Sequence, residues 1–190
     1  MRSLVSGLML VIVAGCTAHV SIVQRGYVLV QSEPTQGAVH PYPGLSIGHS
    51  QGVPIVAVFL STKSDLERLA RRRTHHLYFE LLPCSQNSHG FDLFSGTVFD
   101  ANDDERRQML GPTSPSEVRL YKVHIPFDLQ TLVKKASGQG ALDVPSYLET
   151  AQHDGLCIRV GGAQMWGSAL FSNLARAPLE IRDDSLVVAP

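Results

Sequence analysis

The stretch Val53-Pro54-Ile55-Val56-Ala57-Val58-Phe59-Leu60 is almost entirely apolar and rich in β-branched residues. An uninterrupted apolar run of this length is typical of a central strand that is covered on both faces. Two other stretches have one clear apolar face, through alternation of Leu77, Phe79 and Leu81 and of Leu156, Ile158 and Val160. We therefore expect a strand covered on both faces at 53–60, a strand with one apolar face at 76–84 and a half-buried strand at 156–160.

Shorter strands and helices surround these stretches. Alternation and β-branched residues predict strands at 20–22, 27–30, 91–99 with a break at Gly96, 117–125 with a bulge between Leu120 and Tyr121, and 179–182. Capping residues and apolar spacing predict short helices at 65–73 after a Ser64/Glu67 capping box, from Asp103, from Asp128, and at 145–152. Together these elements predict a mainly β fold, an antiparallel β-sandwich with a few short helical insertions.

An apolar leader at the start of the chain ends at Val13-Ala14-Gly15-Cys16. Its apolar run is too short to span a bilayer, which takes about 20 residues, but it fits a secretory signal. Val13-Ala14-Gly15-Cys16 resembles the lipobox of bacterial lipoproteins, in which the Cys is acylated and the leader is cut before it. The resemblance implies a signal peptide over residues 1–15 and a lipid on Cys16. The alternative is an ordinary cleaved signal peptide that happens to precede a Cys.

The resemblance also implies a location. A diacylglycerol plus an amide-linked chain on Cys16 holds a protein stably on a membrane. Thr17, in place of an Asp after the Cys, favours the outer membrane, with the protein facing the periplasm. Because strand-like sequence begins almost at once, we expect residues 16–190 to form a single domain on a very short tether.

The composition and the residue spacing limit the kinds of partner and ligand that we expect. The chain has 16 Lys and Arg against 17 Asp and Glu, a formal net charge of −1, which argues against a nucleic-acid partner. The eight histidines show neither H-x-x-x-H nor H-E-x-x-H spacing. Residues 100–104 resemble the start of a calcium loop, but Glu105 and Gly111 stand where that loop needs Gly and Glu. We expect no metal and no cofactor.

Cys84 and Cys157 remain once Cys16 is assigned to the lipid. The core faces of their two strands leave Cys84 on the Glu80 side and Cys157 on the Arg159 side. Free thiols placed away from the core would be reactive in an oxidising compartment. The sequence therefore predicts a disulfide between Cys84 and Cys157, and two buried unpaired thiols are the alternative.

A possible catalytic set lies in and after the Gly- and Pro-rich loop at 32–54. Gly48-His49-Ser50-Gln51-Gly52 resembles the nucleophile elbow of α/β-hydrolase lipases and esterases, and Asp143 and His153 follow in that family's order. An elbow needs a strand before the serine and a helix after it, whereas Pro54 and the apolar run at 55–60 predict a strand. Too few residues precede Ser50 to build the earlier strands of that fold.

We therefore expect a lipid-anchored protein that works by protein contact, as an accessory or assembly subunit of a cell-envelope complex such as a secretion scaffold or pilot. The alternatives are a small serine hydrolase that uses Ser50, Asp143 and His153, and an envelope ligand-binding module that uses the loop at 32–54.

The lipobox interpretation predicts the behaviour of Cys16→Ser. The substitution removes the thiol that is acylated, so the protein should be soluble or keep its leader, and metabolic labelling with a fatty acid should be lost. Complete retention of the variant on membranes after a high-salt wash would contradict the interpretation.

Overall fold

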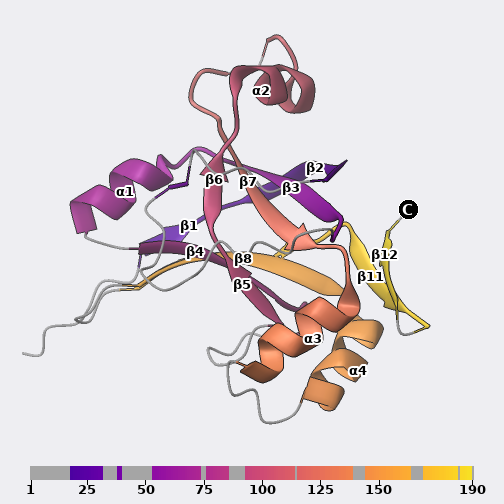
Figure 1. Cartoon of the computed structure of the whole chain (residues 1–190). Coiled ribbons are helices and arrows are strands. Elements are labelled where there is room, and N and C mark those ends of the chain that lie inside the picture. The colour runs from indigo at the N-terminus through magenta and orange to yellow at the C-terminus, as the bar shows by residue number, and fades with distance from the viewer. Residues whose placement is uncertain are drawn as a thin grey trace, which may run out of the picture.

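Two β-sheets packed face to face form most of the protein (Figure 1). The computed structural model describes residues 18–31, 38–39, 53–73, 76–85, 93–113, 115–138, 144–163, 169–183 and 185–189. Sheet B has the order β2-β3-β7-β6, with β2 (Val23–Val30), β3 (Ile55–Thr62), β7 (Arg119–Pro126) and β6 (Val98–Asp100). Sheet A has the order β1-β9-β8-β4-β5, with β10 beside β8; its strands are β1 (Ala18–Val20), β9 (Ala169–Ser172), β8 (Leu156–Ala163), β4 (His76–Pro83), β5 (Phe94–Gly96) and β10 (Ala175–Arg176). The strand pairs are antiparallel except β1 with β9.

The main core lies between the two sheets. Leu77, Phe79 and Leu81 of β4 are fully buried in it, as are Leu156, Ile158 and Val160 of β8. These are the inner faces that alternation predicts, but the half-buried strand predicted at 156–160 is wrong in one respect: Cys157 and Arg159 on the other face of β8 are buried too, at 5% and 7% exposed. From sheet B, alternate residues of β3 and β7 complete the same core. Burial of each large aliphatic side chain contributes roughly 1.5–3 kcal/mol, so this contact dominates the stability of the fold. The prediction of a mainly β sandwich is confirmed.

Strand β3 is central in sheet B, as the run at 53–60 predicts. All eight of its residues are buried, because both faces of the strand are covered. Val56, Val58 and Leu60 face the main core, whereas Ala57 and Phe59 contribute to a second, smaller cluster on the other face of the sheet.

Helix α2 (Asp103–Leu110) covers that second face. Met109 and Leu110 pack against the smaller cluster, and a Cβ atom at Gly26 would lie 2.8 Å from Met109 Sδ. A residue without a side chain therefore lets α2 approach β2 closely. Lys122 of β7 holds the same helix through Glu105, with Nζ 2.7 and 2.9 Å from the two carboxylate oxygens.

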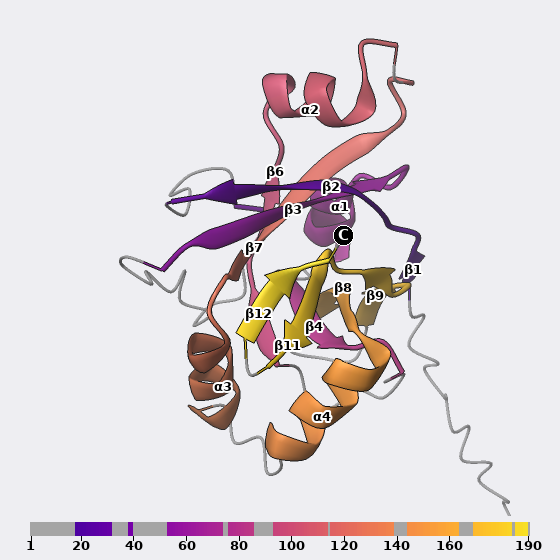
Figure 2. The same ribbon diagram turned by 90° about the vertical axis from the view of Figure 1, so that its right-hand side faces the viewer.

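The other helices lie elsewhere. Helices α3 (Leu129–Gly138) and α4 (Val144–Asp154) lie at the end of the sandwich opposite α2 (Figure 2). Helix α1 (Leu66–Arg73) follows β3 and lies at one side of the molecule (Figure 1). Strands β11 (Leu179–Arg182) and β12 (Ser185–Val188) form a separate hairpin, so the strand predicted at 179–182 exists but pairs with its own successor. Within the described part of the chain, no helix is long and apolar enough to cross a membrane.

The chain passes between the sheets at two places that the sequence did not reveal. The strand predicted at 20–22 ends at Val20, and Ile22 already leads into sheet B. Asn173 holds this crossing, because its Oδ1 accepts from Ile22 N at 2.7 Å and its Nδ2 donates to Ile22 O at 3.0 Å. The single broken strand predicted at 91–99 is wrong in its topology: β5 lies in sheet A and β6 in sheet B, with buried Thr97 between them.

The predicted bulge in β7 is also wrong. β7 pairs with β3 in unbroken register, from Pro126 opposite Ile55 to Arg119 opposite Thr62. Leu120 and Tyr121 are both buried because each face of β7 has its own apolar cluster. The irregular pairing in sheet B lies instead in β2, where the register shifts between Gln24 and Gly26 and Arg25 is the extra residue.

Capping side chains begin the helices. Asp65, not Ser64, caps α1, since Asp65 Oδ1 accepts from Arg68 N at 2.8 Å; the predicted Ser64/Glu67 box is wrong. At α2, Asn102 and Glu105 form a complete capping box. Asp128 caps α3 as predicted, with Oδ2 accepting from Thr131 N at 2.8 Å and from Thr131 Oγ1 at 2.5 Å. The hydrogen bond from the Thr131 hydroxyl is the main reason that the pKa of the Asp128 carboxyl is lowered.

The predicted disulfide is confirmed. Cys84 and Cys157 are bonded, with Cα atoms 4.9 Å apart and a sequence separation of 73. Cys84 follows the last residue of β4, and Cys157 lies opposite Leu82 in the adjacent strand β8. The bond therefore joins two neighbouring strands of sheet A at one end of their ladder.

Replacing both cysteines by serine should lower the free energy of unfolding by up to about 4 kcal/mol, because the open chain gains the entropy of a long loop. Urea denaturation of the oxidised wild type, the reduced wild type and the double variant measures the effect. We expect the reduced wild type and the variant to match. Equal stability of all three proteins would contradict the prediction.

Candidate functional site

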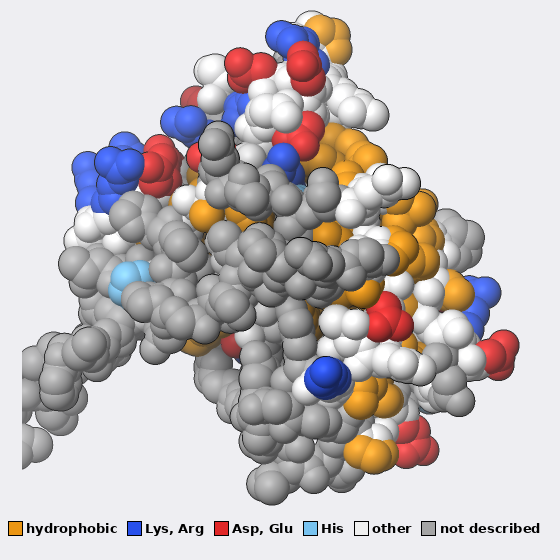
Figure 3. All heavy atoms as spheres, viewed as in Figure 1, with side chains coloured by type: hydrophobic (Ala, Val, Ile, Leu, Met, Phe, Trp, Pro, Cys, Tyr) orange, Lys and Arg blue, Asp and Glu red, His pale blue; other side chains and the backbone are white. Residues whose placement is uncertain are grey.

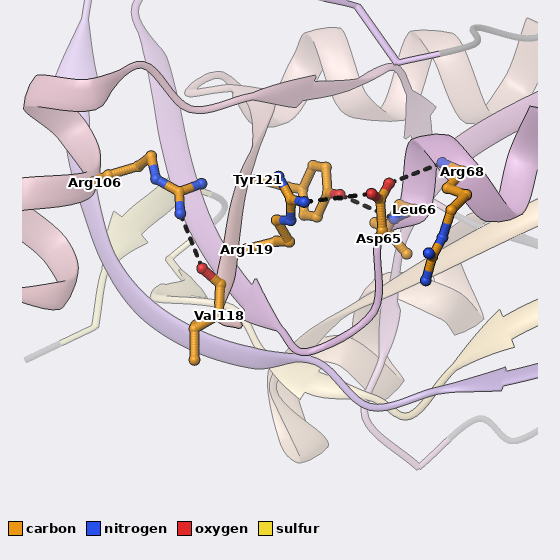
Figure 4. A network of polar contacts seen from close by, with 7 residues as sticks. All are labelled: Asp65, Leu66, Arg68, Arg106, Val118, Arg119 and Tyr121. Atoms are coloured by element: carbon orange, nitrogen blue, oxygen red, sulfur yellow. Dashed lines mark hydrogen bonds and ion pairs between the residues drawn. The ribbon is translucent and has the colours of Figure 1, made fainter. Parts of the chain in front are cut away.

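The described residues present three features with functional potential: a polar corner between β3 and α1, a buried histidine on β7, and the outer edge of β2. We call the first the β3–α1 corner and define it by Asp65, Leu66, Arg119 and Tyr121. Figure 4 shows these side chains converging where β3 ends and α1 begins.

Tyr121 is the centre of the β3–α1 corner. Its side chain comes from β7, is 2% exposed, and its hydroxyl oxygen accepts from Leu66 N at 2.9 Å. This bond satisfies one of the free N–H groups at the start of α1. Burial raises the pKa of the Tyr121 hydroxyl to about 12, so the phenol stays neutral at physiological pH. Tyr121 is thus a structural anchor rather than an acid or base.

Charged side chains surround this anchor. Asp65 caps α1, and its Oδ2 lies 3.5 Å from an Nη atom of Arg119. Arg106 reaches from α2 and donates to Val118 O at 3.0 Å, which fixes the segment before β7. Burial, together with Glu67 nearby, raises the pKa of the Asp100 carboxyl. The Arg119–Asp65 pair is largely solvated and contributes little stability, so the corner positions backbone rather than performing chemistry.

His124 is the second feature. It is 6% exposed on β7 and stacks on Phe99, with ring centroids 5.1 Å apart. Its Nδ1 has no hydrogen-bond partner among the described residues. Burial, and then the charge of Lys122, lowers the pKa of the His124 imidazole to about 4. The ring is therefore neutral at physiological pH.

The outer edge of β2 is the third feature, which we call the β2 edge. β2 ends sheet B, and in the described part of the chain no strand pairs with its outer side. Val23, Tyr27 and Leu29 are 48%, 40% and 56% exposed, although they are apolar. Figure 3 shows hydrophobic side chains gathered on the surface below α2. The apolar run at 27–30 predicts a strand but does not distinguish a central strand from an edge strand. This exposed surface therefore could not be recognised from the sequence.

The predicted hydrolase set is only partly visible. His153 lies near the end of α4, exposed, with Nδ1 2.7 Å from Asp154 Oδ1. This hydrogen bond raises the pKa of the His153 imidazole and lowers that of the Asp154 carboxyl. Ser50, Asp143 and most of the loop at 32–54 lie outside the described residues, as does the lipid-attachment residue Cys16.

The acidic stretch after β6 has structural partners. Asn102 and Glu105 cap α2 together, and Glu105 also pairs with Lys122. No group of three or more His, Cys, Asp or Glu among the described residues is arranged to hold a metal ion.

No protein-family model, no curated protein and no solved structure matches this chain significantly.

Burial of neutral His124 predicts a loss of stability in acid. In the unfolded chain the imidazole takes up a proton near pH 6.5, whereas in the folded protein it does so only near pH 4. The unfolded state thus binds more protons between these values. The free energy of unfolding should fall as the pH falls, by about 3 kcal/mol in total from this group.

Denaturation at a series of pH values from 7 to 4 checks this prediction against a His124→Phe control. Phenylalanine keeps an aromatic ring against Phe99 and does not titrate, while every other histidine is common to both proteins. We expect a steeper loss for the wild type; parallel curves for the two proteins would rule out the assigned role of His124.

Proposed function

We propose that this protein is a lipid-anchored envelope lipoprotein, facing the periplasm from the outer membrane, which acts as an accessory or assembly subunit. In this proposal, the β2 edge receives an extended segment of another envelope protein. The lipobox-like residues Val13-Ala14-Gly15-Cys16 support the anchoring. The observation that carries the contact function is the exposed apolar character of the β2 edge.

Edge strands expose unpaired N–H and C=O groups, and proteins usually protect them with charges, prolines or bulges. On β2 this protection is confined to one half of the strand. The bulge and Arg25 lie near its start, whereas the second half reads Tyr27-Val28-Leu29-Val30 with no charge and no proline. The second half is therefore the part that suits main-chain pairing with an added strand.

The two faces beside this edge set the chemistry of the partner segment. Tyr27 and Leu29 flank one face, and Met109 and Leu110 of α2 flank the other, next to Val28 and Val30. Side chains of an added strand would alternate between these two faces. Because both faces are apolar, we expect apolar residues at both the odd and the even positions of the partner segment. Such a segment would be unfavourable in water on its own, which favours a stable assembly over a transient encounter.

The proposal predicts that Leu29→Lys disrupts assembly without disrupting the fold. The Leu29 side chain is 56% exposed, so a lysine is tolerated in the free protein but would be desolvated in the contact. We expect the variant to lose at least about tenfold in assembly, the equivalent of one buried apolar side chain.

Native gel electrophoresis of full-length protein, extracted in mild detergent with Cys16 intact, measures the assembled fraction. Gln130→Lys places the same charge on an exposed position of α3 and serves as the matched control. The wild type and the control should migrate with a second polypeptide, and Leu29→Lys should migrate alone. The proposal fails if all three proteins migrate alike or if the assembly contains only this chain.

A further inference from the structure

A pocket of about 240 Å³ lies between the bulge of β2 and the end of β3. We call it the bulge pocket. Apart from two valines, its lining consists of two cationic and four hydroxyl side chains: Arg25, Lys63, Ser21, Ser61, Thr62 and Ser64. It is smaller than the roughly 300–1,000 Å³ clefts that hold drug-sized ligands, so it suits a ligand group of only a few atoms.

The bulge gives Arg25 its place in this pocket. Val23 pairs with Ser61 and Gly26 with Phe59, which leaves Arg25 without a residue opposite it in β3. Its Nε donates to Ser61 Oγ at 2.7 Å, and Ser61 Oγ in turn donates to Val23 O at 3.4 Å. Bulges often re-aim a side chain next to a functional site. Here the bulge and a buried serine together fix the orientation of a guanidinium group, whose terminal nitrogens take part in no other hydrogen bond or ion pair within the described residues.

The charges of the pocket are uncompensated. No carboxylate lines it, and within the described residues neither Arg25 nor Lys63 takes part in an ion pair. The nearest acid in sequence, Asp65, is engaged by the α1 cap and by Arg119 in the adjacent β3–α1 corner. Two cationic side chains that line the same pocket with no carboxylate beside them favour binding of an anion there.

The other hydroxyl groups can add hydrogen-bond donors; Ser61 cannot, because its only proton is already donated to Val23 O. Ser61 and Thr62 are 3% and 5% exposed, so packing restricts the motion of both side chains. Thr62 Oγ1 accepts from Ser64 N at 3.0 Å, which leaves its own proton to donate. A guanidinium, an ammonium and hydroxyl donors around a small space match the several acceptor oxygens of a tetrahedral oxyanion.

We infer that the bulge pocket binds a phosphate-type oxyanion. A phospholipid headgroup is the source that we favour, and this choice of source rests on the proposed anchoring, whereas the preference for an oxyanion does not. Ser21 lines the pocket and follows Cys16 by five residues. A chain spans at most about 3.6 Å per residue, so the Cα atoms of Ser21 and Cys16 lie within roughly 18 Å of each other. A lipid on Cys16 would therefore keep the pocket near the headgroup layer.

Thermal unfolding of the full-length protein in a neutral detergent tests the inference. One arm adds inorganic phosphate against sodium chloride at matched ionic strength, and a second arm adds phosphatidylglycerol to the micelles without free phosphate. Ligand at ten times its dissociation constant should raise the Tm of the wild type by roughly 3–6 °C. Arg25→Gln with Lys63→Gln should abolish the rise.

Two further proteins keep the result interpretable. Arg72→Gln with Lys134→Gln removes the same charge from exposed helical positions and should keep the rise. Lys63→Glu changes a side chain that takes part in no ion pair within the described residues, so it should lose the rise even if loss of the Arg25–Ser61 bond destabilises the double variant. A rise with both ligands supports a headgroup source, and a rise with phosphate alone supports a soluble phosphate ligand. The inference is overturned if neither ligand raises the Tm, or if the variants at Arg25 and Lys63 respond as the wild type does.

The outcome is separable from the proposed function. If neither phosphate nor lipid raises the Tm while Leu29→Lys still disrupts assembly, the inference about the bulge pocket is overturned and the proposed contact function stands. If the Tm rises as expected but no assembly with another polypeptide is found, the proposed contact function is overturned and the inference about the bulge pocket stands.

Discussion

The apolar contact between β3 and β7 on one side and β4 and β8 on the other is the constraint on which the rest of the structure depends. These four strands come from separate parts of the chain and bury their alternate side chains in one core. β3 is also buried on its second face, so sheet B needs an additional cover, which α2 supplies through Met109 and Leu110. The position of α2, and with it one wall of the β2 edge, thus follows from the two-sided burial of β3.

The parts of the fold that the sequence predicts are those in which local pattern and burial agree. Alternation within β4 and β8 identifies their inner faces, and the same parity places Cys84 and Cys157 within reach of each other. In β7, alternation of apolar residues does not identify the buried face correctly. Leu120 and Tyr121 break the alternation, and a bulge is the local explanation, but the physical reason is that two different clusters cover the two faces of a regular strand. Only the tertiary arrangement distinguishes these explanations.

The candidate sites were harder to predict because they arise where elements meet. The bond from Leu66 N to the Tyr121 hydroxyl joins residues that are 55 apart in sequence. Arg25 belongs to the bulge pocket because one residue of β2 has no partner in β3, a feature with no sequence signature beyond the neighbouring Gly26. The exposure of Tyr27 and Leu29 likewise depends on β2 being the last strand of its sheet. Strand order is set by long-range pairing, which periodicity does not report.

The side chain of Asn173 has a mechanical consequence. It bonds both the N–H and the C=O of Ile22, and its own backbone N–H donates to Val20 O at 3.2 Å, so it extends the parallel ladder of β1 and β9 past the last residue of β1. A tension applied at the N-terminal side of Ala18 must load this ladder in shear, several hydrogen bonds at once, before it reaches the bulge of β2. If the chain is held at Cys16 as we propose, a pull on the N-terminal side is therefore borne first by the edge of sheet A, and β2 of sheet B is loaded only after the β1–β9 ladder breaks.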